Sequence, residues 1–288
     1  MRRNIFIVTL LFMSCFSFIP ISNALSQTYF NISSTGTIVN TSTKVRTLLG
    51  CNLNLPSDTV LEALKPEIGI ATHWGDLSLD FEDTWLLKDA ASLFSEHKIY
   101  GMITDPKWHP DPIGLAKWYA EKSLEHPEIT GVFLDDTMRQ LKTGPPDGWS
   151  RETLNEMIRL IRTINPALKI LITYYPEYEA NDQFDFDFDE VWFSISFPYQ
   201  IPNVDALFEF AYTKFNGKRI LTAAYPEGGW KNLAWTLDEF RTCLEKFRDY
   251  YVQGKTMGAT MYIRSGENFL ENNPEFLAVA KEVLNPTH

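Results

Sequence analysis

Residues 129–138 read ITGVFLDDTM, an apolar and β-prone run that stops abruptly at two aspartates, Asp135 and Asp136. Seven further runs of this kind recur along the chain, and segments with helical spacing separate them. The eight runs cover residues 47–53, 68–73, 99–105, 129–135, 169–175, 191–197, 219–225 and 258–264. We therefore expect eight buried strands, the fourth of which ends in the two carboxylates.

Four of the intervening segments have the spacing and end signals of helices. They cover residues 81–98, 111–126, 150–164 and 237–252, and Ser150 opens one of them as a helix-capping residue. Strands that alternate with helices predict an α/β protein built on a parallel sheet. Because the chain has no glycine-rich dinucleotide fingerprint, we expect a single (β/α)8 TIM barrel, with a doubly wound open sheet as the alternative.

The N-terminus has the pattern of a secretory signal peptide. Arg2 and Arg3 precede an apolar run over residues 5–21, and Ser22-Asn23-Ala24 fits a small-residue cleavage site. We expect residues 1–24 to be removed and the mature protein to be secreted. An uncleaved N-terminal anchor is the alternative, although the run is short for a membrane span.

The mature chain is expected to divide into a lead-in segment over residues 25–46 and one catalytic barrel domain over residues 47–288. Asn31 and Asn40 begin Asn-x-Ser/Thr sequons in the lead-in, so this segment is predicted to be exposed and glycosylated. Composition narrows the partners. The net charge of -11 disfavours nucleic acid and anionic membranes, and it leaves an uncharged carbohydrate as a suitable substrate for an expected monomer.

In a (β/α)8 barrel the active site lies where the strands end, because the variable loops emerge there. Polar and aromatic side chains follow the ends of the predicted strands. The candidates for substrate binding are His73, Trp74, Asp105, Trp108, Asp136, Tyr175, Tyr199, Tyr225, Trp230, Tyr262 and Arg264. At the opposite ends stand Lys98, Glu128, Lys169, Glu190 and Arg219, which we interpret as ordinary solvated strand starts.

Side chains alternate between the two faces of a strand, so parity assigns each residue to the barrel interior or to the helices. Gly131 and Phe133 fit the interior, and Asp135 shares their parity. We therefore expect Asp135 to be the inward carboxylate. The same reasoning predicts that two further side chains face the mouth, His73 with the parity of Gly69 and Ala71, and Arg264 with that of Thr260 and Tyr262.

Carboxylates beside aromatic side chains at a barrel mouth indicate glycoside hydrolysis. The reaction needs one carboxylic acid that protonates the leaving oxygen and one carboxylate that acts as nucleophile or base. Asp135 is the expected catalytic residue, and its partner is Glu227 or Glu177, which end near-identical Tyr-Pro-Glu sequences after the seventh and fifth strands. Glu227 is preferred because the seventh strand lies across the mouth from the fourth. No cofactor and no metal are expected.

Residues 131–135, read as Gly-Val-Phe-Leu-Asp, resemble the fourth-strand motif of the secreted endo-α-1,4-polygalactosaminidase family of glycoside hydrolases. The resemblance implies a (β/α)8 barrel and a catalytic role for Asp135. It covers this one strand, together with the signal peptide and the alternation of strands and helices. Ile129-Thr130 replaces the family's Asp-Gly pair, and Tyr175-Pro176-Glu177 replaces its Asn-Gly-rich turn. The substrate and the second carboxylate therefore stay open.

Two other classes of protein fit part of the pattern. A metal-dependent hydrolase is one, because His73, Asp105, His109 and Asp135 are ligand types near the same face. The sequence shows no His-x-His on the first strand and no His-Glu-x-x-His motif to support it. A carbohydrate-binding barrel without activity is the other, because stacking and hydrogen bonding to a sugar need no proton transfer.

Overall fold

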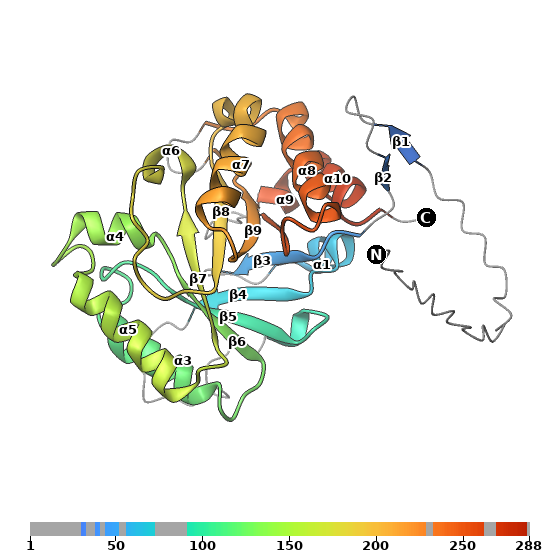
Figure 1. The fold of residues 1–288 in the computed structure, drawn as a ribbon. Helices are drawn as coiled ribbons and strands as arrows, with labels where there is room; N and C mark the ends of the chain where they lie inside the picture. The colour runs from blue at the N-terminus through green and yellow to red at the C-terminus, as the bar shows by residue number, and fades with distance from the viewer. Residues whose placement is uncertain are drawn as a thin grey trace, which may run out of the picture.

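The structure, a computed structural model, describes residues 30–32, 38–40, 44–51, 56–72, 91–228, 233–261 and 269–286. Eight parallel strands in this part of the chain close into a barrel (Figure 1). In chain order they are β3 (Thr47–Cys51), β4 (Ile68–Thr72), β5 (Lys98–Ile103), β6 (Ile129–Leu134), β7 (Lys169–Tyr174), β8 (Glu190–Ile195), β9 (Arg219–Ala224) and β10 (Gly258–Met261). β10 pairs with both β9 and β3, which completes the ring. The predicted (β/α)8 barrel and all eight of its strands are confirmed.

Helices connect the strands and cover the outside of the barrel. The described helical elements are α1 (Asp58–Leu64), α3 (Pro112–Lys122), α4 (Thr137–Thr143), α5 (Arg151–Ile164), α6 (Pro176–Glu179), the 3-10 helix η2 (Pro198–Asn203), α7 (Val204–Lys214), α8 (Leu237–Val252), α9 (Phe269–Asn272) and α10 (Pro274–Leu284). The Ser150 side chain accepts a hydrogen bond from the Thr153 amide and caps α5, as predicted. The predicted helices over residues 111–126, 150–164 and 237–252 are confirmed as α3, α5 and α8. Most of the remaining predicted helix, residues 81–98, lies outside the described residues.

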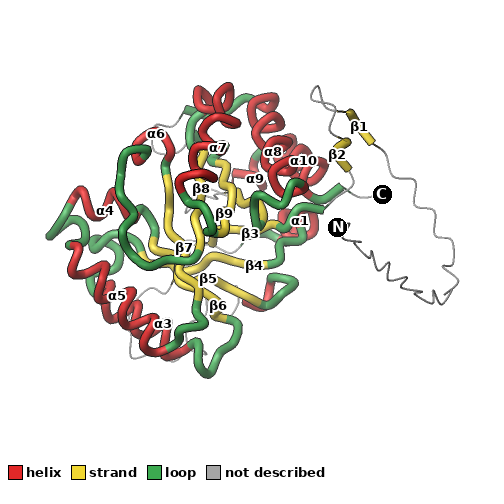
Figure 2. Tube along the Cα trace, viewed as in Figure 1, coloured by secondary structure: helices red, strands yellow, loops and turns green. Residues whose placement is uncertain are grey.

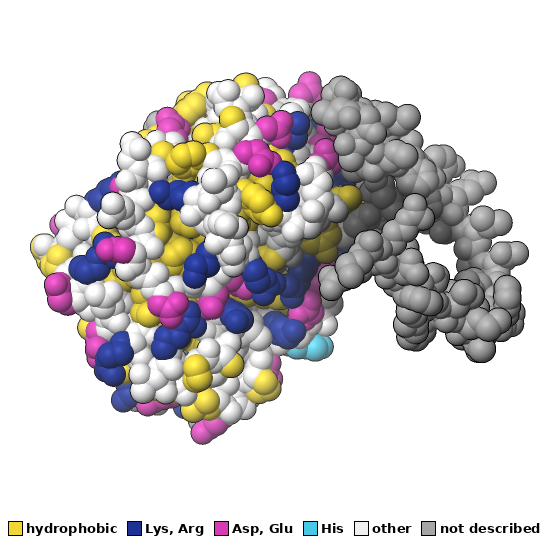
Figure 3. Space-filling view, in the orientation of Figure 1, with side chains coloured by type: hydrophobic (Ala, Val, Ile, Leu, Met, Phe, Trp, Pro, Cys, Tyr) yellow, Lys and Arg dark blue, Asp and Glu magenta, His cyan; other side chains and the backbone are white. Residues whose placement is uncertain are grey.

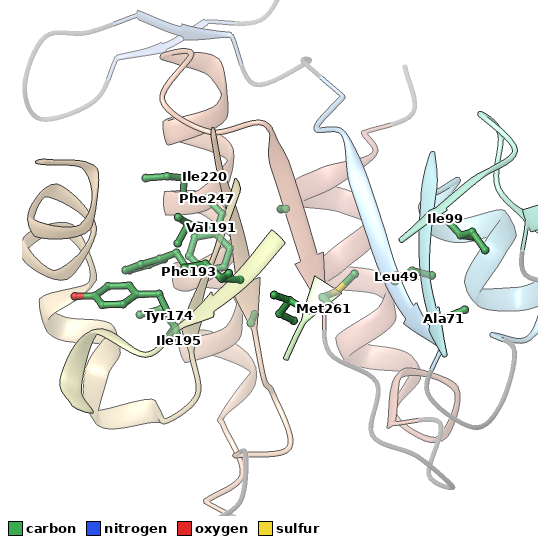
Figure 4. Close-up of a cluster of buried hydrophobic side chains, with 14 of the residues drawn as sticks. Leu49, Ala71, Ile99, Tyr174, Val191, Phe193, Ile195, Ile220, Phe247 and Met261 are labelled. Carbon is green, nitrogen blue, oxygen red and sulfur yellow. The ribbon is translucent and has the colours of Figure 1, made fainter. Parts of the chain in front are cut away.

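Two apolar clusters lie on opposite sides of the strands. The interior cluster contains Ile68, Ile70, Tyr100, Met102, Phe133, Leu171, Trp192, Leu221, Ala223, Tyr225 and Met257. Within it the rings of Phe133 and Trp192 stack with centroids 4.9 Å apart. The larger outer cluster lies between the strands and the helices, and Figure 4 shows Val191, Phe193 and Ile195 on one side of β8 within it. The barrel interior is therefore a packed core rather than a pore.

The expected parity is right on β6 and wrong on β4. Phe133 lies in the interior cluster, and a Cβ at Gly131 would overlap the interior ring of Tyr100. On β4, however, Ile68 and Ile70 face the interior. Gly69 faces the helices, where a Cβ would overlap the ring of Phe94. Gly69 makes room for the ring of Phe94 on the outer side of β4. The small size of a glycine does not reveal on which side of the strand such a ring packs.

The segment before the barrel contains β1 (Phe30–Ile32) and β2 (Ile38–Asn40), which pair antiparallel in a separate two-stranded sheet (Figure 2). The sequon residues Asn31 and Asn40 lie in these two strands. Residues 1–24, the predicted signal peptide, lie outside the described residues. Among the helices that the structure describes, none has the length and apolar character needed to cross a membrane.

Candidate functional site

Asp135 follows β6 directly and points into the mouth of the barrel. Its amide donates a hydrogen bond of 2.9 Å to the Ile103 carbonyl, which extends the ladder between β6 and β5. Thr173 of β7 is fully buried and shares interior parity with Leu171. The Thr173 hydroxyl donates to Asp135 Oδ1 at 3.0 Å. Because this partner lies on the inner face of β7, the Asp135 carboxylate is directed inward.

Asp136 turns the chain sharply beside Asp135. Its backbone is left-handed, with φ 52° and ψ 30°, and it occupies the N-cap position of α4. A non-glycine residue in this region costs on the order of 1–3 kcal/mol and often marks a functional site. The turn directs the Asp136 amide to Asp135 Oδ1 at 2.9 Å and to the Thr173 hydroxyl oxygen at 3.0 Å.

The Asp136 carboxylate is held by two side chains from neighbouring elements. The Tyr175 hydroxyl donates to Asp136 Oδ1 at 2.7 Å, and Arg139 Nη1 of α4 donates to Oδ2 at 2.6 Å. Asp136 in turn raises the pKa of the Arg139 guanidinium. This carboxylate is therefore an ion-paired and hydrogen-bonded anion.

Asp135 differs electrostatically from its neighbour. Burial raises the pKa of Asp135 to about 8, and the negative charge of Asp136 adds to the effect, whereas the Thr173 hydroxyl and the Asp136 amide oppose it. Asp135 is therefore a carboxyl whose surroundings favour the protonated form, and it lies beside the ion-paired Asp136. Such a pair can supply an acid and a fixed negative charge at one place.

A cavity of about 540 Å³ opens beside Asp136 and the two side chains that hold it, Arg139 and Tyr175. It lies on the side of the barrel where β6 and β7 end, and a volume of this size accommodates a small-molecule ligand. The residues that line it are Asp136, Arg139, Lys142, Thr143, Tyr175, Tyr178 and Glu179. Its two cations are each ion-paired, Arg139 with Asp136 at 2.6 Å and Lys142 with Asp182 at 2.6 Å.

Glu179 is a buried carboxyl that the sequence analysis missed. It is 2% exposed and lines the cavity from α6. Its Oε2 accepts the Tyr175 amide hydrogen at 2.9 Å, and burial raises its pKa to about 8. The sequence has two glutamates after Pro176, and the predicted partner of Asp135 was Glu177, the nearer of the two. Only the second glutamate reaches back to the start of α6, a local signal that resembles helix capping.

The two predicted partners of Asp135 lie in different environments. Glu177 is exposed, and its Oε2 accepts hydrogen bonds from the Tyr199 hydroxyl at 2.8 Å and from Gln200 Nε2 at 3.4 Å. Glu227 is partly buried in the turn after β9, which the Gly228 amide closes onto the Tyr225 carbonyl at 2.8 Å. The half-buried position suits a catalytic carboxylate better than the rim position of Glu177.

Tyrosines follow the ends of β7, β8 and β9. Tyr175 and Tyr225 are both buried, and Tyr225 belongs to the interior cluster. Burial raises the pKa of Tyr175, and the charges of Asp136, Tyr225 and Asp135 raise it further. These four side chains therefore lie close together. Tyr199 lies at the rim, 44% exposed, with its ring stacked on Phe197.

The residues after β5 mostly shape their own loop. Asp105 Oδ1 accepts the Lys107 amide hydrogen at 3.1 Å, and Trp108 is 53% exposed with Lys107 Nζ 5.2 Å from its ring centroid. His109 is buried, and its Nδ1 accepts the Thr104 amide hydrogen at 2.9 Å. Asp105 also contributes to the raised pKa of Arg139, which locates it near the cavity.

Five of the predicted site residues lie outside the described residues, namely His73, Trp74, Trp230, Tyr262 and Arg264. His73 was expected to face the mouth because it shares the parity of Gly69 and Ala71. On β4, however, Ile70 of the opposite parity faces the interior. On β10 the outer cluster contains Ala259 and Met261, so Thr260 faces the interior as expected. Within the described ranges, no three His, Cys, Asp or Glu side chains form a group that could hold a metal ion.

Comparison with known proteins supports the fold. No protein-family model and no curated protein matches this sequence. A solved GH113 β-1,4-mannanase is similar, with a TM-score of 0.56 at 13% identity over 84% of this chain and 99% of that one. A glucosidase from Croceicoccus marinus gives 0.52 at 10% identity, covering 83% and 68% of the two chains.

The family 5 glycoside hydrolase PbGH5A from Prevotella bryantii B14 gives a TM-score of 0.50 at 10% identity, covering 82% of this chain and 95% of that one. At such low identity these likenesses establish the (β/α)8 barrel and not the activity. Function must therefore be argued from the site itself.

Proposed function

We propose that this chain is a glycoside hydrolase in which Asp135 is the general acid. The observation that carries the proposal is a partly buried carboxyl with a pKa raised to about 8, at the end of β6, beside an ion-paired carboxylate. A carboxyl that keeps its proton at neutral pH can protonate a glycosidic oxygen as the bond breaks. The similar barrels of a mannanase and a glucosidase add support, since their shared fold carries this chemistry.

Glu227 is the proposed second carboxylate. It follows β9, which two strands separate from β6 in the barrel, and it is half-buried whereas Glu177 is exposed. A partly buried carboxylate near the mouth can attack the anomeric carbon or activate a water molecule. Tyr175 and Arg139 would then act as positioning residues, because they hold Asp136 and thereby its charge next to Asp135.

We propose a neutral or amino-sugar polysaccharide as the substrate. Both cations that line the cavity are ion-paired, whereas Tyr178, which is 43% exposed, offers aromatic surface to a sugar ring. The motif over residues 131–135 resembles that of the endo-α-1,4-polygalactosaminidases, which makes polymers of galactosamine the first substrate to test. The likeness to a β-1,4-mannanase makes mannan the second.

The proposed enzyme acts outside the cell as a monomer. The basis is the signal-peptide pattern over residues 1–24 and its small-residue site at Ala24. Expression with the native N-terminus should yield protein in the medium whose first residue is Leu25. Recovery of chain only in the membrane fraction, with residue 1 retained, would replace secretion with an N-terminal anchor.

The deciding experiment measures hydrolysis of α-1,4-linked galactosamine, β-1,4-mannan and β-1,4-glucan by the wild type, Asp135→Asn, Glu227→Gln and Glu177→Gln. We expect cleavage by the wild type, loss of cleavage in Asp135→Asn and Glu227→Gln, and retention in Glu177→Gln. Glycan binding without turnover by every protein would show a binding barrel instead. Activity that a chelator abolishes would show a metal-dependent hydrolase.

A further inference from the structure

A second cavity lies at the opposite end of the barrel, where the strands begin. Its volume is about 370 Å³. Its lining comes from the starts of β4, β5, β6, β7 and β9 and from the ends of α3 and α5. Four of the described residues that line it are cationic, and none of them is acidic. The four are Arg46, Lys98, Lys169 and Arg219.

Two of these cations share a single carboxylate. Arg46 Nη2 donates to both oxygens of Glu96 at 2.9 Å, and Lys98 Nζ donates to Glu96 Oε2 at 2.8 Å. A guanidinium has five N–H donors and an ammonium has three. One carboxylate therefore leaves this pair with a surplus positive charge and with several donors for a further acceptor.

The other two cations each have one carboxylate neighbour. Lys169 Nζ lies 4.0 Å from Asp189 Oδ1, beyond hydrogen-bonding distance, while Arg162 Nη2 binds the other oxygen of Asp189 at 2.9 Å. Arg219 Nη1 lies 2.8 Å from Glu190 Oε1. Roughly half of the side chains of Lys169 and Arg219 are exposed, at 45% and 52%. Their remaining donors are thus open to a ligand in the cavity.

The surplus of positive charge is local. The chain as a whole has a net charge of -11, and over the face drawn in Figure 3 basic and acidic side chains are intermixed. A concave site that is lined by four cations and no acid therefore departs from the rest of the molecule. Such a site concentrates anions by focusing their attraction into a confined volume.

We propose that this cavity binds a tetrahedral oxyanion, sulfate or phosphate, either free or carried on a sugar. Three of the four cations begin separate strands and Arg46 directly precedes β3, so these two guanidinium and two ammonium groups suit a doubly charged anion with several oxygens better than a planar carboxylate. The volume exceeds that of the anion alone and leaves room for an attached sugar ring. This inference does not rest on the proposed hydrolysis.

The test is calorimetric titration of the purified chain, at low ionic strength, with inorganic sulfate, inorganic phosphate, galactose 6-sulfate and acetate. The informative variant is Lys98→Gln combined with Lys169→Gln, because it leaves the buried Glu190 with its Arg219 partner. The matched control is Lys117→Gln combined with Lys246→Gln, which removes the same charge from exposed ion pairs on α3 and α8.

We expect one molar equivalent of sulfate or phosphate to bind, roughly tenfold more weakly in the cavity variant and unchanged in the control. Tighter binding of galactose 6-sulfate than of sulfate would identify an anion carried on a sugar, and equal binding would identify the free ion. Absence of saturable binding, equal binding of acetate, or equal weakening in the control variant would overturn the proposal.

Discussion

The two ends of this barrel carry the same three-residue unit, a carboxylate held by a tyrosine and an arginine. At the mouth, the hydroxyl of Tyr175 binds Asp136 at 2.7 Å and Arg139 binds it at 2.6 Å. At the base, the hydroxyl of Tyr100 binds Glu190 at 2.6 Å and Arg219 lies 2.8 Å from it. Each unit satisfies a carboxylate that the fold removes from water.

What differs is the surplus carboxyl at the mouth. Asp135 lies beside the first unit, and none of the described cations forms an ion pair with it. Burial and the adjacent charge therefore raise its pKa to about 8. At the base the adjacent carboxylate, Asp189, is ion-paired with Arg162 at 2.9 Å. The shared unit holds a carboxylate at both ends, and the proposed proton transfer belongs to the end where a second carboxyl has no cationic partner.

The substitution with the greatest expected loss of turnover changes Asp135 and leaves the Tyr175, Arg139 and Asp136 unit in place. Asp135→Asn should lower turnover about 10²- to 10⁴-fold, because the amide cannot donate the proton of a general acid. The asparagine oxygen can still accept from Thr173 and from the Asp136 amide. Unchanged circular dichroism would show that folding is intact. Full turnover in this folded variant would remove Asp135 from the mechanism.

The same substitution should change how the stability of the fold depends on pH. A carboxyl with a raised folded-state pKa stabilises the fold only while it stays protonated, so its contribution falls as pH rises from about 4 to about 8. Asp135→Asn removes that pH-dependent loss, so its stability relative to the wild type should be higher at pH 8 than at pH 4. Urea unfolding at both pH values measures the difference. Parallel pH profiles for the two proteins would contradict it.

A matched pair of tyrosine variants compares the two ends directly. Tyr175→Phe and Tyr100→Phe each remove one hydroxyl that binds a carboxylate. Each should cost about 1.5–3 kcal/mol of stability, as expected for a hydrogen bond to a charged group. Only Tyr175→Phe should also lower turnover, since only the mouth unit positions Asp135. Equal loss of turnover in both variants would make the effect structural.

A smaller effect concerns the charge beside Asp135. Asp136→Asn removes the negative charge that helps to raise the pKa of Asp135. The basic limb of the profile of turnover against pH should therefore move to lower pH, by about one unit. The corresponding substitution at the base, Glu190→Gln, should leave that limb in place. A basic limb that moves upward in Asp136→Asn would refute the assigned electrostatics.

The smallest expected effect comes from Thr173, whose hydroxyl lowers the pKa of Asp135. Thr173→Val should raise that pKa further and shift the basic limb upward by a fraction of a unit. It should also cost about 1 kcal/mol of stability through the lost hydrogen bond. A downward shift of the limb would mean that the hydroxyl stabilises the protonated form.

Several features of the site followed from local patterns, and others did not. The inward direction of Asp135 followed from its parity with Phe133, which period-two alternation makes a local property. The outward direction of Gly69 could not be predicted in this way, because a small residue fits either side of a strand. Glu190 was interpreted as a solvated strand start but is fully buried. Its partners Tyr100 and Arg219 come from two other strands, and no local signal joins them.

The eight strands, the barrel and the end of the barrel at which Asp135 lies could all be predicted from the sequence. These properties depend on the spacing of apolar residues and on the direction of the chain, and both can be read along a single segment. The desolvation of Asp135 and Glu179 and the ion pair of Asp136 could not, because contacts between distant segments produce them. Desolvation and pairing depend on neighbours such as Thr173, 38 residues away from Asp135, that folding alone brings into contact.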